Sequence, residues 1–200
     1  MTGANLSPTS QPPADLSAMR DELRHLLARF AVRHGTFTLS SGETSDLYVD
    51  CRVVATLPRA MRCIGALMLD LLRDLPDVRG VGGLAIGADP IAAAVAMSSL
   101  EGDREIPMFM VRKEPKGHGL RRRIEGAFPE QSGASVVVVD DVITKGGSVL
   151  QAIEAVETET EARVARAVLI VDRLEGGAEM LRQKGYDVRS IFTRHDFTPA

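Results

Sequence analysis

The feature that most constrains the fold is a run of four valines, residues 136–139, followed directly by Asp140 and Asp141. Consecutive β-branched apolar residues are typical of a strand that is buried on both faces, as in a parallel sheet. A turn containing a pair of glycines follows at residues 144–148, and the spacing of apolar residues after it predicts a helix. Ligands of open α/β sheets bind at the carboxyl ends of the strands. The two carboxylates are therefore expected at a ligand-binding edge.

The turn at residues 144–148 has the composition of a phosphate-binding loop. Its glycines let backbone N–H groups approach an anion, the hydroxyls of Thr144 and Ser148 add donors, and the helix N-terminus adds its dipole. Two adjacent acids suit sugar hydroxyls or a hydrated Mg²⁺, and they repel each other unless a cation is present. A P-loop NTPase also has an apolar strand that ends in acids. That class needs a Gly-rich loop ending in Gly-Lys-Ser/Thr, which the sequence lacks.

Composition narrows the class of protein further. A chain of 200 residues with 44% hydrophobic and 26% charged residues suits one α/β domain with a sizeable core. The net charge of −3 argues against a general nucleic-acid binder. Cys51 and Cys63 form no metal-type cluster, which favours core packing in a reduced, cytoplasmic protein. No apolar run reaches the length of a membrane span. Residues 1–14 are interpreted as a disordered tail and residues 15–200 as a single domain.

The order of predicted elements indicates the fold class. A first helix is expected from Leu16 to about His34, with Gly35 as its stop signal, and two strand-like runs over residues 37–50 suggest a hairpin. Helix–strand units then repeat, which predicts an α/β fold with a mainly parallel sheet flanked by helices. A small N-terminal hood is expected from about residues 15–56 and the C-terminal segment. Further strands are expected at 81–86, 106–111, 164–171 and 188–192, and further helices at 58–74, 91–100 and around 180–185.

Two other segments carry candidate binding residues. Residues 112–123 are rich in Arg, Lys and Gly and leave the carboxyl end of a predicted strand. A solvated loop is the ordinary explanation of such a charge run, but in an acidic protein this position suits a mobile loop that covers a polyanion. The turn at residues 87–90 offers a second, weaker anion site at a helix N-terminus. Arg173 also follows a predicted strand.

Together these segments resemble the orotate phosphoribosyltransferases of the type I phosphoribosyltransferase family, over about residues 16–195. The resemblance rests on the hood segment 37–42 ahead of Tyr48, on the loop 112–119, on the motif 136–148, and on Asp172-Arg173. The loop pattern Arg-Lys-Glu-x-Lys-x-His-Gly is the most specific of these, because purine enzymes of the same fold carry different loops.

The resemblance implies a glycosyltransferase that joins orotate to 5-phosphoribosyl diphosphate (PRPP), releasing diphosphate and orotidine 5′-monophosphate in pyrimidine biosynthesis. It implies Mg²⁺ as cofactor, held mainly through PRPP and water near Asp140 and Asp141. It also implies a cytoplasmic homodimer in which loop 112–123 serves the neighbouring subunit, without nucleic-acid or membrane partners. The residues given catalytic roles are Asp140, Asp141, Lys113 and His118. Those expected to bind PRPP and diphosphate are Arg112, Lys113, Lys116, His118, Asp140, Asp141, Val142, Ile143, Thr144, Lys145, Gly146, Gly147 and Ser148. Those expected to bind orotate are Ser40, Tyr48, Thr144 and Arg173.

Two departures from the family pattern and two alternatives accompany this interpretation. Many family members carry Lys where Ser40 stands and Lys in the segment occupied here by residues 87–89, so we expect strong dependence on Mg²⁺ and on the loop cations. A phosphoribosyltransferase for a purine base would share the PRPP motif, but Arg173 and the loop pattern weigh against it. A non-catalytic PRPP-sensing regulator would need a DNA-binding domain, and the residues before the fold supply only a short polar tail and one helix.

Overall fold

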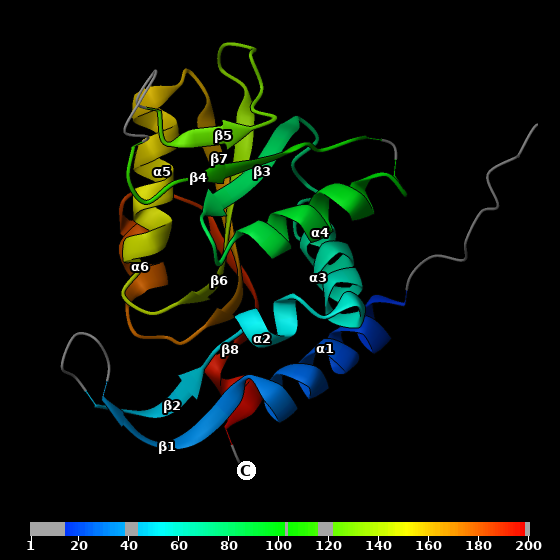
Figure 1. The fold of residues 1–200 in the computed structure, drawn as a ribbon, viewed down its shortest axis with the longest axis vertical. Coiled ribbons are helices and arrows are strands. Elements are labelled where there is room, and N and C mark those ends of the chain that lie inside the picture. The colour runs from blue at the N-terminus through cyan, green and yellow to red at the C-terminus, as the bar shows by residue number, and fades with distance from the viewer. Residues whose placement is uncertain (1–14, 39–43, 103, 116–121, 199–200) are drawn as a thin grey trace, which may run out of the picture.

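A computed structural model describes residues 15–38, 44–102, 104–115 and 122–198. The described residues form a six-stranded sheet in the order β5-β4-β3-β6-β7-β8 (Figure 1). Its neighbouring strands are parallel, apart from the antiparallel pair of β4 and β5. The strands are β3 (Val78–Leu84), β4 (Met108–Val111), β5 (Ile124–Gly126), β6 (Ser135–Ile143), β7 (Arg163–Asp172) and β8 (Val188–Thr193). The predicted tail at residues 1–14 lies outside the described residues.

Helices cover both faces of this sheet. Figure 1 shows α3 (Pro58–Asp70) and α4 (Asp89–Ser99) on one side, and α5 (Gly147–Glu159) and α6 (Gly177–Gln183) on the other. Val137 and Val139 belong to the core that contains α3 and α4, whereas Val136 and Val138 belong to the core that contains α5. Alternate valines of this run therefore pack into two different cores, one on each face of the sheet. The predicted mainly parallel α/β fold is confirmed. No helix in the described ranges is long and apolar enough to span a bilayer.

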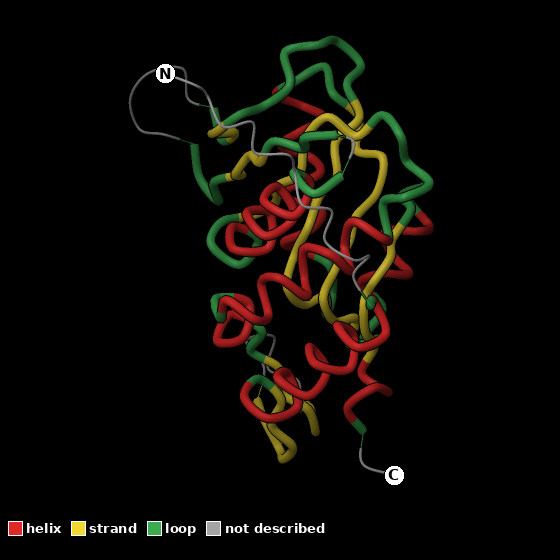
Figure 2. The backbone as a smooth tube through the Cα atoms, turned by 90° about the vertical axis from the view of Figure 1, so that its right-hand side faces the viewer, coloured by secondary structure: helices red, strands yellow, loops and turns green. Residues whose placement is uncertain are grey.

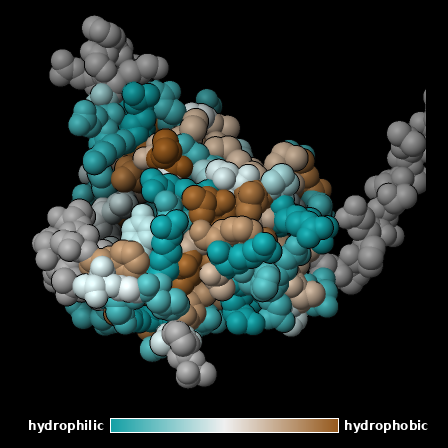
Figure 3. Space-filling view, turned by 60° about the horizontal axis from the view of Figure 1, so that its bottom comes forward, coloured by the Kyte–Doolittle hydropathy of each residue, from teal (hydrophilic) through white to brown (hydrophobic). Residues whose placement is uncertain are grey.

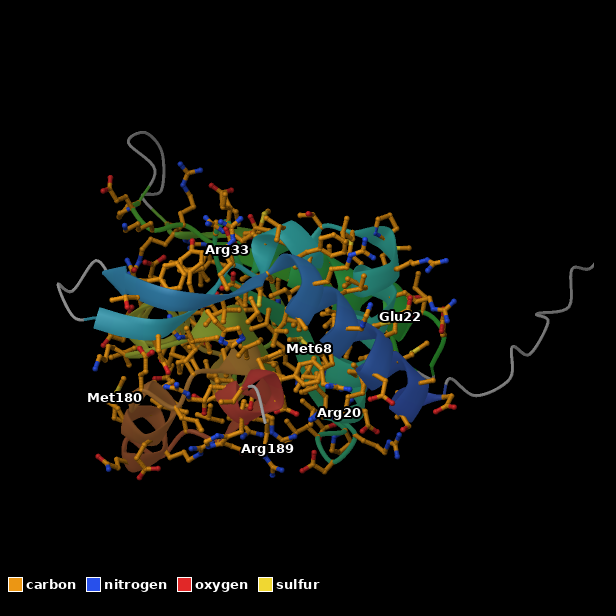
Figure 4. All side chains as sticks on the ribbon, turned by 90° about the horizontal axis from the view of Figure 1, so that it is seen from below. Arg20, Glu22, Arg33, Met68, Met180 and Arg189 are labelled. Atoms are coloured by element: carbon orange, nitrogen blue, oxygen red, sulfur yellow. The ribbon has the colours of Figure 1, made fainter. Side chains whose placement is uncertain are left out.

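The hood stands apart from the main sheet in the ribbon and in the backbone tube (Figures 1 and 2). It contains α1 (Leu16–Phe30), the antiparallel pair β1 (Val32–Thr38) and β2 (Thr44–Val49), and the short α2 (Arg52–Ala55). The C-terminal 3₁₀ turn η1 (Arg194–Phe197) packs beside α1. Arg20 of α1 donates to Ile191 O at 2.9 Å and to Asp196 Oδ1 at 3.0 Å, so the hood is joined to the end of the chain (Figure 4).

The sequence prediction was wrong at several places, and the short helices α2 and η1 were not predicted. The first helix ends at Phe30, and Gly35 lies within β1 at φ +151°, where the register shifts between His34 and Phe37. Pairing of Val32 with Val49 favours strand over helix there, because β-branched residues fit a pleated surface better than a helix. The helix expected to reach about residue 74 ends at Asp70. Strand β5 was not predicted, because its three residues are too few to show an alternating pattern.

Candidate active site

A cavity of about 390 Å³ opens where the carboxyl ends of β3 and β6 meet the hood. Strand β6 and the turn after it contribute one wall, the β3–α4 connection a second, and β2 with its following residues a third. The lining residues are Tyr48, Val49, Asp50, Arg52, Leu84, Ala85, Ile86, Gly87, Asp140, Asp141, Val142, Thr144, Ser148 and Arg173. The carboxyl edge of a parallel sheet is where a ligand site was expected.

The turn between β6 and α5 is shaped by glycines from two segments. Gly146 precedes α5 with φ +83°, a left-handed conformation that glycine adopts without a side-chain clash. Gly177, at the start of α6, donates its N–H to Thr144 O at 2.9 Å. A Cβ on Gly177 would lie only 2.5 Å from Gly146 N, so α6 can approach the turn only because Gly177 has no side chain. No sequence motif indicates this role for Gly177.

Asp140 and Asp141 form a pair of adjacent carboxyl groups, the first buried and the second half-buried. Asp140 is 5% exposed. Its Oδ1 accepts the N–H of Asp141 at 3.0 Å, and Asp141 Oδ1 accepts the N–H of Val142 at 2.8 Å. Burial, with the neighbouring Asp141 charge second, raises the pKa of Asp140 to about 8. Burial also raises the pKa of Asp141, against the opposing effects of the Val142 N–H and of Arg52.

The pair fits a divalent cation that brings most of its own ligands. Mg²⁺ takes oxygen ligands and usually retains several waters, together with one or two carboxylates and substrate phosphates. The described residues contain no group of three or more His, Cys, Asp or Glu that could enclose a metal. Asp140 and Asp141 can therefore offer carboxylate oxygens to a cation whose other ligands are water and substrate, but they do not form a protein cage.

The connection from β3 to α4 lies directly across from the acids. A Cβ on Gly87 would be 3.4 Å from Asp140 Oδ1 and 3.5 Å from Asp141 Oδ1. Gly87 therefore leaves space beside both carboxylates and brings no side-chain charge to them. Positive charge for an anionic ligand must reach this part of the cavity from another segment or from a metal ion.

Two residues expected to bind a planar base meet at the hood side of the cavity. Tyr48 is 38% exposed, and its ring centroid lies 5.5 Å from that of Phe37. Arg173 is 4% exposed; its Nη2 donates to Leu47 O at 2.7 Å and pairs with Glu175 Oε1 at 2.7 Å. Arg173 thus holds β2 against the end of β7, with its guanidinium at the cavity wall.

The remaining predicted residues lie around the cavity or outside the described ranges. Arg112 and Lys113 follow β4 and do not line the cavity. The base of their loop is held by a bond from Arg112 N to Arg123 O at 2.8 Å and by one from Gln151 Nε2 to Lys113 O at 2.9 Å. Ser40, Lys116 and His118 fall outside the described residues. Among residues 142–148, those that do not line the cavity are Ile143, Lys145, Gly146 and Gly147.

Asp50 and Arg52 are charged cavity residues that no sequence motif indicated. They follow β2 directly, and Arg52 donates from Nε to Asp50 Oδ1 at 2.8 Å and from Nη2 to Asp50 Oδ2 at 3.0 Å. The available signal was a charged pair at the end of a predicted strand, next to Tyr48. Helical or strand periodicity could not have assigned it to the site.

Comparisons with known proteins agree with this geometry. A family model of the phosphoribosyl transferase domain matches residues 76–196. The chain is 44% identical over 188 residues to the orotate phosphoribosyltransferase of Rhodopirellula baltica, which covers 90% of this chain and 96% of that protein. It is also similar to the crystal structure of the Mycobacterium tuberculosis orotate phosphoribosyltransferase in complex with Fe(III) dicitrate, with TM-score 0.78, 41% identity, and coverage of 90% and 99% of the two chains. The structure of that M. tuberculosis enzyme with PRPP matches with TM-score 0.73 and 37% identity over 90% and 98%.

Proposed function

The chain belongs to the orotate phosphoribosyltransferase family, and from this premise we propose how its cleft divides the work of the reaction. The enzyme transfers the phosphoribosyl group of PRPP to orotate, giving orotidine 5′-monophosphate and diphosphate in pyrimidine biosynthesis. One observation supports the division of roles: Asp140 and Asp141, the turn at the N-terminus of α5 and Arg173 border a single cavity.

The turn after β6 binds the 5′-phosphate of PRPP. Its backbone N–H groups and the hydroxyls of Thr144 and Ser148 are donors, and the N-terminus of α5 adds a favourable dipole. Gly177 fixes the carbonyl of Thr144, which keeps the turn in one conformation. The 5′ end of the ribose then lies at the carboxyl end of β6, and the ribose ring lies over Asp140 and Asp141.

Asp140 and Asp141 accept hydrogen bonds from the ribose 2′- and 3′-hydroxyls. Positive charge develops at C1′ as diphosphate departs, and two carboxylates fixed in a dry site favour that charge without reorganising. Mg²⁺, when bound near these acids through PRPP and water, neutralises charge on the diphosphate. Binding of the cation and the sugar also relieves the cost of burying the carboxylates.

Arg173 recognises orotate. Its guanidinium is held by Leu47 O and Glu175, so it presents a fixed planar donor to the orotate carboxylate. Tyr48 covers one face of the pyrimidine ring, while Thr144 and Ser40 contribute polar contacts. A purine base carries no carboxylate for Arg173 to bind, so this pairing favours orotate.

The loop cations act on the leaving diphosphate across a cytoplasmic homodimer. Arg112, Lys113 and Lys116 supply positive charge, and His118 donates a hydrogen bond or a proton to the leaving group. Apolar side chains are exposed on the hood side of the molecule, among them Phe30, Val53 and Leu57, which suits an interface between subunits (Figure 3).

Hybrid dimers test the sharing of the loop. A subunit carrying Asp140→Asn is mixed with one carrying Lys113→Ala, each alone being weakly active. If each loop serves the neighbouring site, the hybrid contains one site with intact acids and an intact loop, so activity is regained on mixing. No regain in a dimer that exchanges subunits would show that the loop serves its own subunit.

The reaction itself is tested by the loss of orotate ultraviolet absorbance with PRPP and Mg²⁺, with purine bases and uracil in parallel. Consumption of orotate only when PRPP and metal are both present is the expected result. Turnover of a purine in place of orotate would overturn the role given to Arg173.

A further inference from the structure

Arg52 lies in the same cavity as the two acids but has no role in the scheme above. We propose that Arg52, oriented by Asp50, is a diphosphate-binding residue that contacts the diphosphate group of PRPP and of the released product. This inference rests on the proposed function, since it assigns a further contact to the same reaction.

The guanidinium of Arg52 is held in one orientation. Two hydrogen bonds join it to the two carboxylate oxygens of Asp50, at 2.8 and 3.0 Å, and the backbone N–H of Arg52 reaches Asp50 Oδ1 at 3.2 Å. Asp50 is itself fixed by its N–H, which donates to Ala31 O at 3.0 Å. A guanidinium has five N–H donors, so this pairing orients Arg52 and still leaves donors for an anion.

Charge in the cavity points to Arg52 as the anion contact. Among the described lining residues the cations are Arg52 and Arg173, against three carboxylates, Asp50, Asp140 and Asp141. The Arg173 side chain is 5% exposed and is engaged with Glu175, whereas the Arg52 side chain is 56% exposed. A polyanion that enters a cavity lined by these acids needs a cation within reach, and Arg52 is the more accessible of the two.

The position of Arg52 suits the diphosphate end of PRPP. Arg52 lines the same cavity as Asp140 and Asp141, at the side formed by the residues that follow β2. Gly87 faces the same acids and brings no charge of its own. The leaving group must lie beside the acids if C1′ lies over them, so Arg52 supplies the cation that the β3–α4 connection does not.

The affinities of three ligands distinguish a diphosphate contact by Arg52 from other roles of this residue. We would measure binding of PRPP, inorganic diphosphate and ribose 5-phosphate to the wild type, Arg52→Ala and Arg52→Lys, at fixed Mg²⁺. Arg52→Ala should weaken PRPP and diphosphate by about tenfold or more, the scale of one hydrogen bond to a charged group. Ribose 5-phosphate, which lacks the diphosphate, should change by less than about twofold, and Arg52→Lys should recover part of the loss.

Steady-state kinetics and a matched control complete the test. The KM for PRPP should rise more than the KM for orotate, while Arg59→Ala, an exposed arginine on α3, should behave as the wild type. Unchanged diphosphate binding, equal losses for all three ligands, or a rise in the orotate KM alone would each overturn the assignment. If the wild type itself fails to consume orotate with PRPP, the proposed function fails instead, so the two failures are distinguishable.

Discussion

Arg173 Nη2 donates to the carbonyl oxygen of Leu47 at 2.7 Å, between residues 126 positions apart in the chain. Leu47 precedes Tyr48 in β2, and Arg173 directly follows β7, so this bond joins the hood to the main sheet at the cavity. Tyr48 and Arg173, two of the residues proposed to bind orotate, therefore depend on each other for their positions. If Arg173 binds orotate as proposed, one guanidinium couples substrate recognition to docking of the hood.

Replacing Arg173 should affect orotate far more than PRPP. Arg173→Ala removes the proposed carboxylate contact and the bond to Leu47, so the orotate KM should rise by about tenfold or more. It also leaves Glu175, whose side chain is 16% exposed, without its ion pair, so the free energy of unfolding should fall by about 2–4 kcal/mol. Steady-state kinetics and urea unfolding check both effects.

Arg24→Ala is the matched control for Arg173→Ala, because Arg24 is an arginine on α1 whose side chain is 51% exposed. It should leave both KM values and the stability unchanged. An Arg173→Ala enzyme with a normal KM for orotate and a raised KM for PRPP would show that Arg173 binds PRPP and not orotate.

The buried acid pair should make the ligand-free protein less stable as pH rises. Burial raises the pKa of Asp140 to about 8, above the ordinary value of 3.8 that applies to the unfolded chain. Between these values the folded state binds more protons, so the free energy of unfolding falls as pH rises from about 4 to 8. Asp140→Asn removes this titration. The variant should be more stable than the wild type by about 1–3 kcal/mol at pH 8 and nearly equal to it at pH 4.

Two measurements check this prediction about Asp140 and Asp141. Urea unfolding of wild type and Asp140→Asn at several pH values gives the stability difference directly. The variant should at the same time lose turnover by about 100-fold or more, because it lacks a charge that favours the developing cation at C1′. An Asp140→Asn protein that is less stable than the wild type at pH 8 would contradict the unfavourable burial inferred for Asp140.

The turn at residues 144–148 should not tolerate a side chain on Gly177, the α6 residue that contacts it. In Gly177→Ala the new Cβ would clash with Thr144 O and lie 2.5 Å from Gly146 N, both backbone atoms, so the turn must move. We expect a loss of about 2 kcal/mol or more in stability and weaker PRPP binding. Gly102→Ala is the control, since its Cβ meets its nearest neighbour at an ordinary 3.6 Å. Calorimetric titration with PRPP decides the matter, and wild-type affinity in Gly177→Ala would show that the turn can shift without cost.

The sequence predicts those parts of the site that lie within one continuous segment. Residues 136–148 carry their strand, acids and turn in a local pattern, and the structure places the valines in two cores as expected. Arg173 is found by the same rule, because it also follows a buried strand. In such segments the hydrophobic pattern identifies a buried strand, and the chain direction identifies its carboxyl end, where ligands of parallel sheets bind.

Features set by contacts between distant segments could not be predicted. Arg52 reaches the cavity only because the hood docks beside β6, and Gly177 matters only because α6 touches a turn more than 30 residues earlier. Gly35 was interpreted as a helix stop, but it lies at an irregular position in a hairpin, which depends on pairing with β2. Local propensity carries no information about such pairings.

The absence of a charged side chain at Gly87 predicts unusual dependence on the loop cations and on Mg²⁺. Lys113→Ala, alone and combined with Lys116→Ala, should lower kcat by about 10- to 100-fold and raise the Mg²⁺ concentration needed for half-maximal rate, because fewer cations then neutralise the diphosphate. Lys184→Ala, an exposed lysine at the end of α6, is the matched control. Initial rates over a Mg²⁺ titration at saturating PRPP provide the measurement. Near-normal turnover in the double variant would mean that the charge comes from elsewhere, and a large loss in Arg52→Ala under the same conditions would then identify Arg52 as the principal cation for the diphosphate.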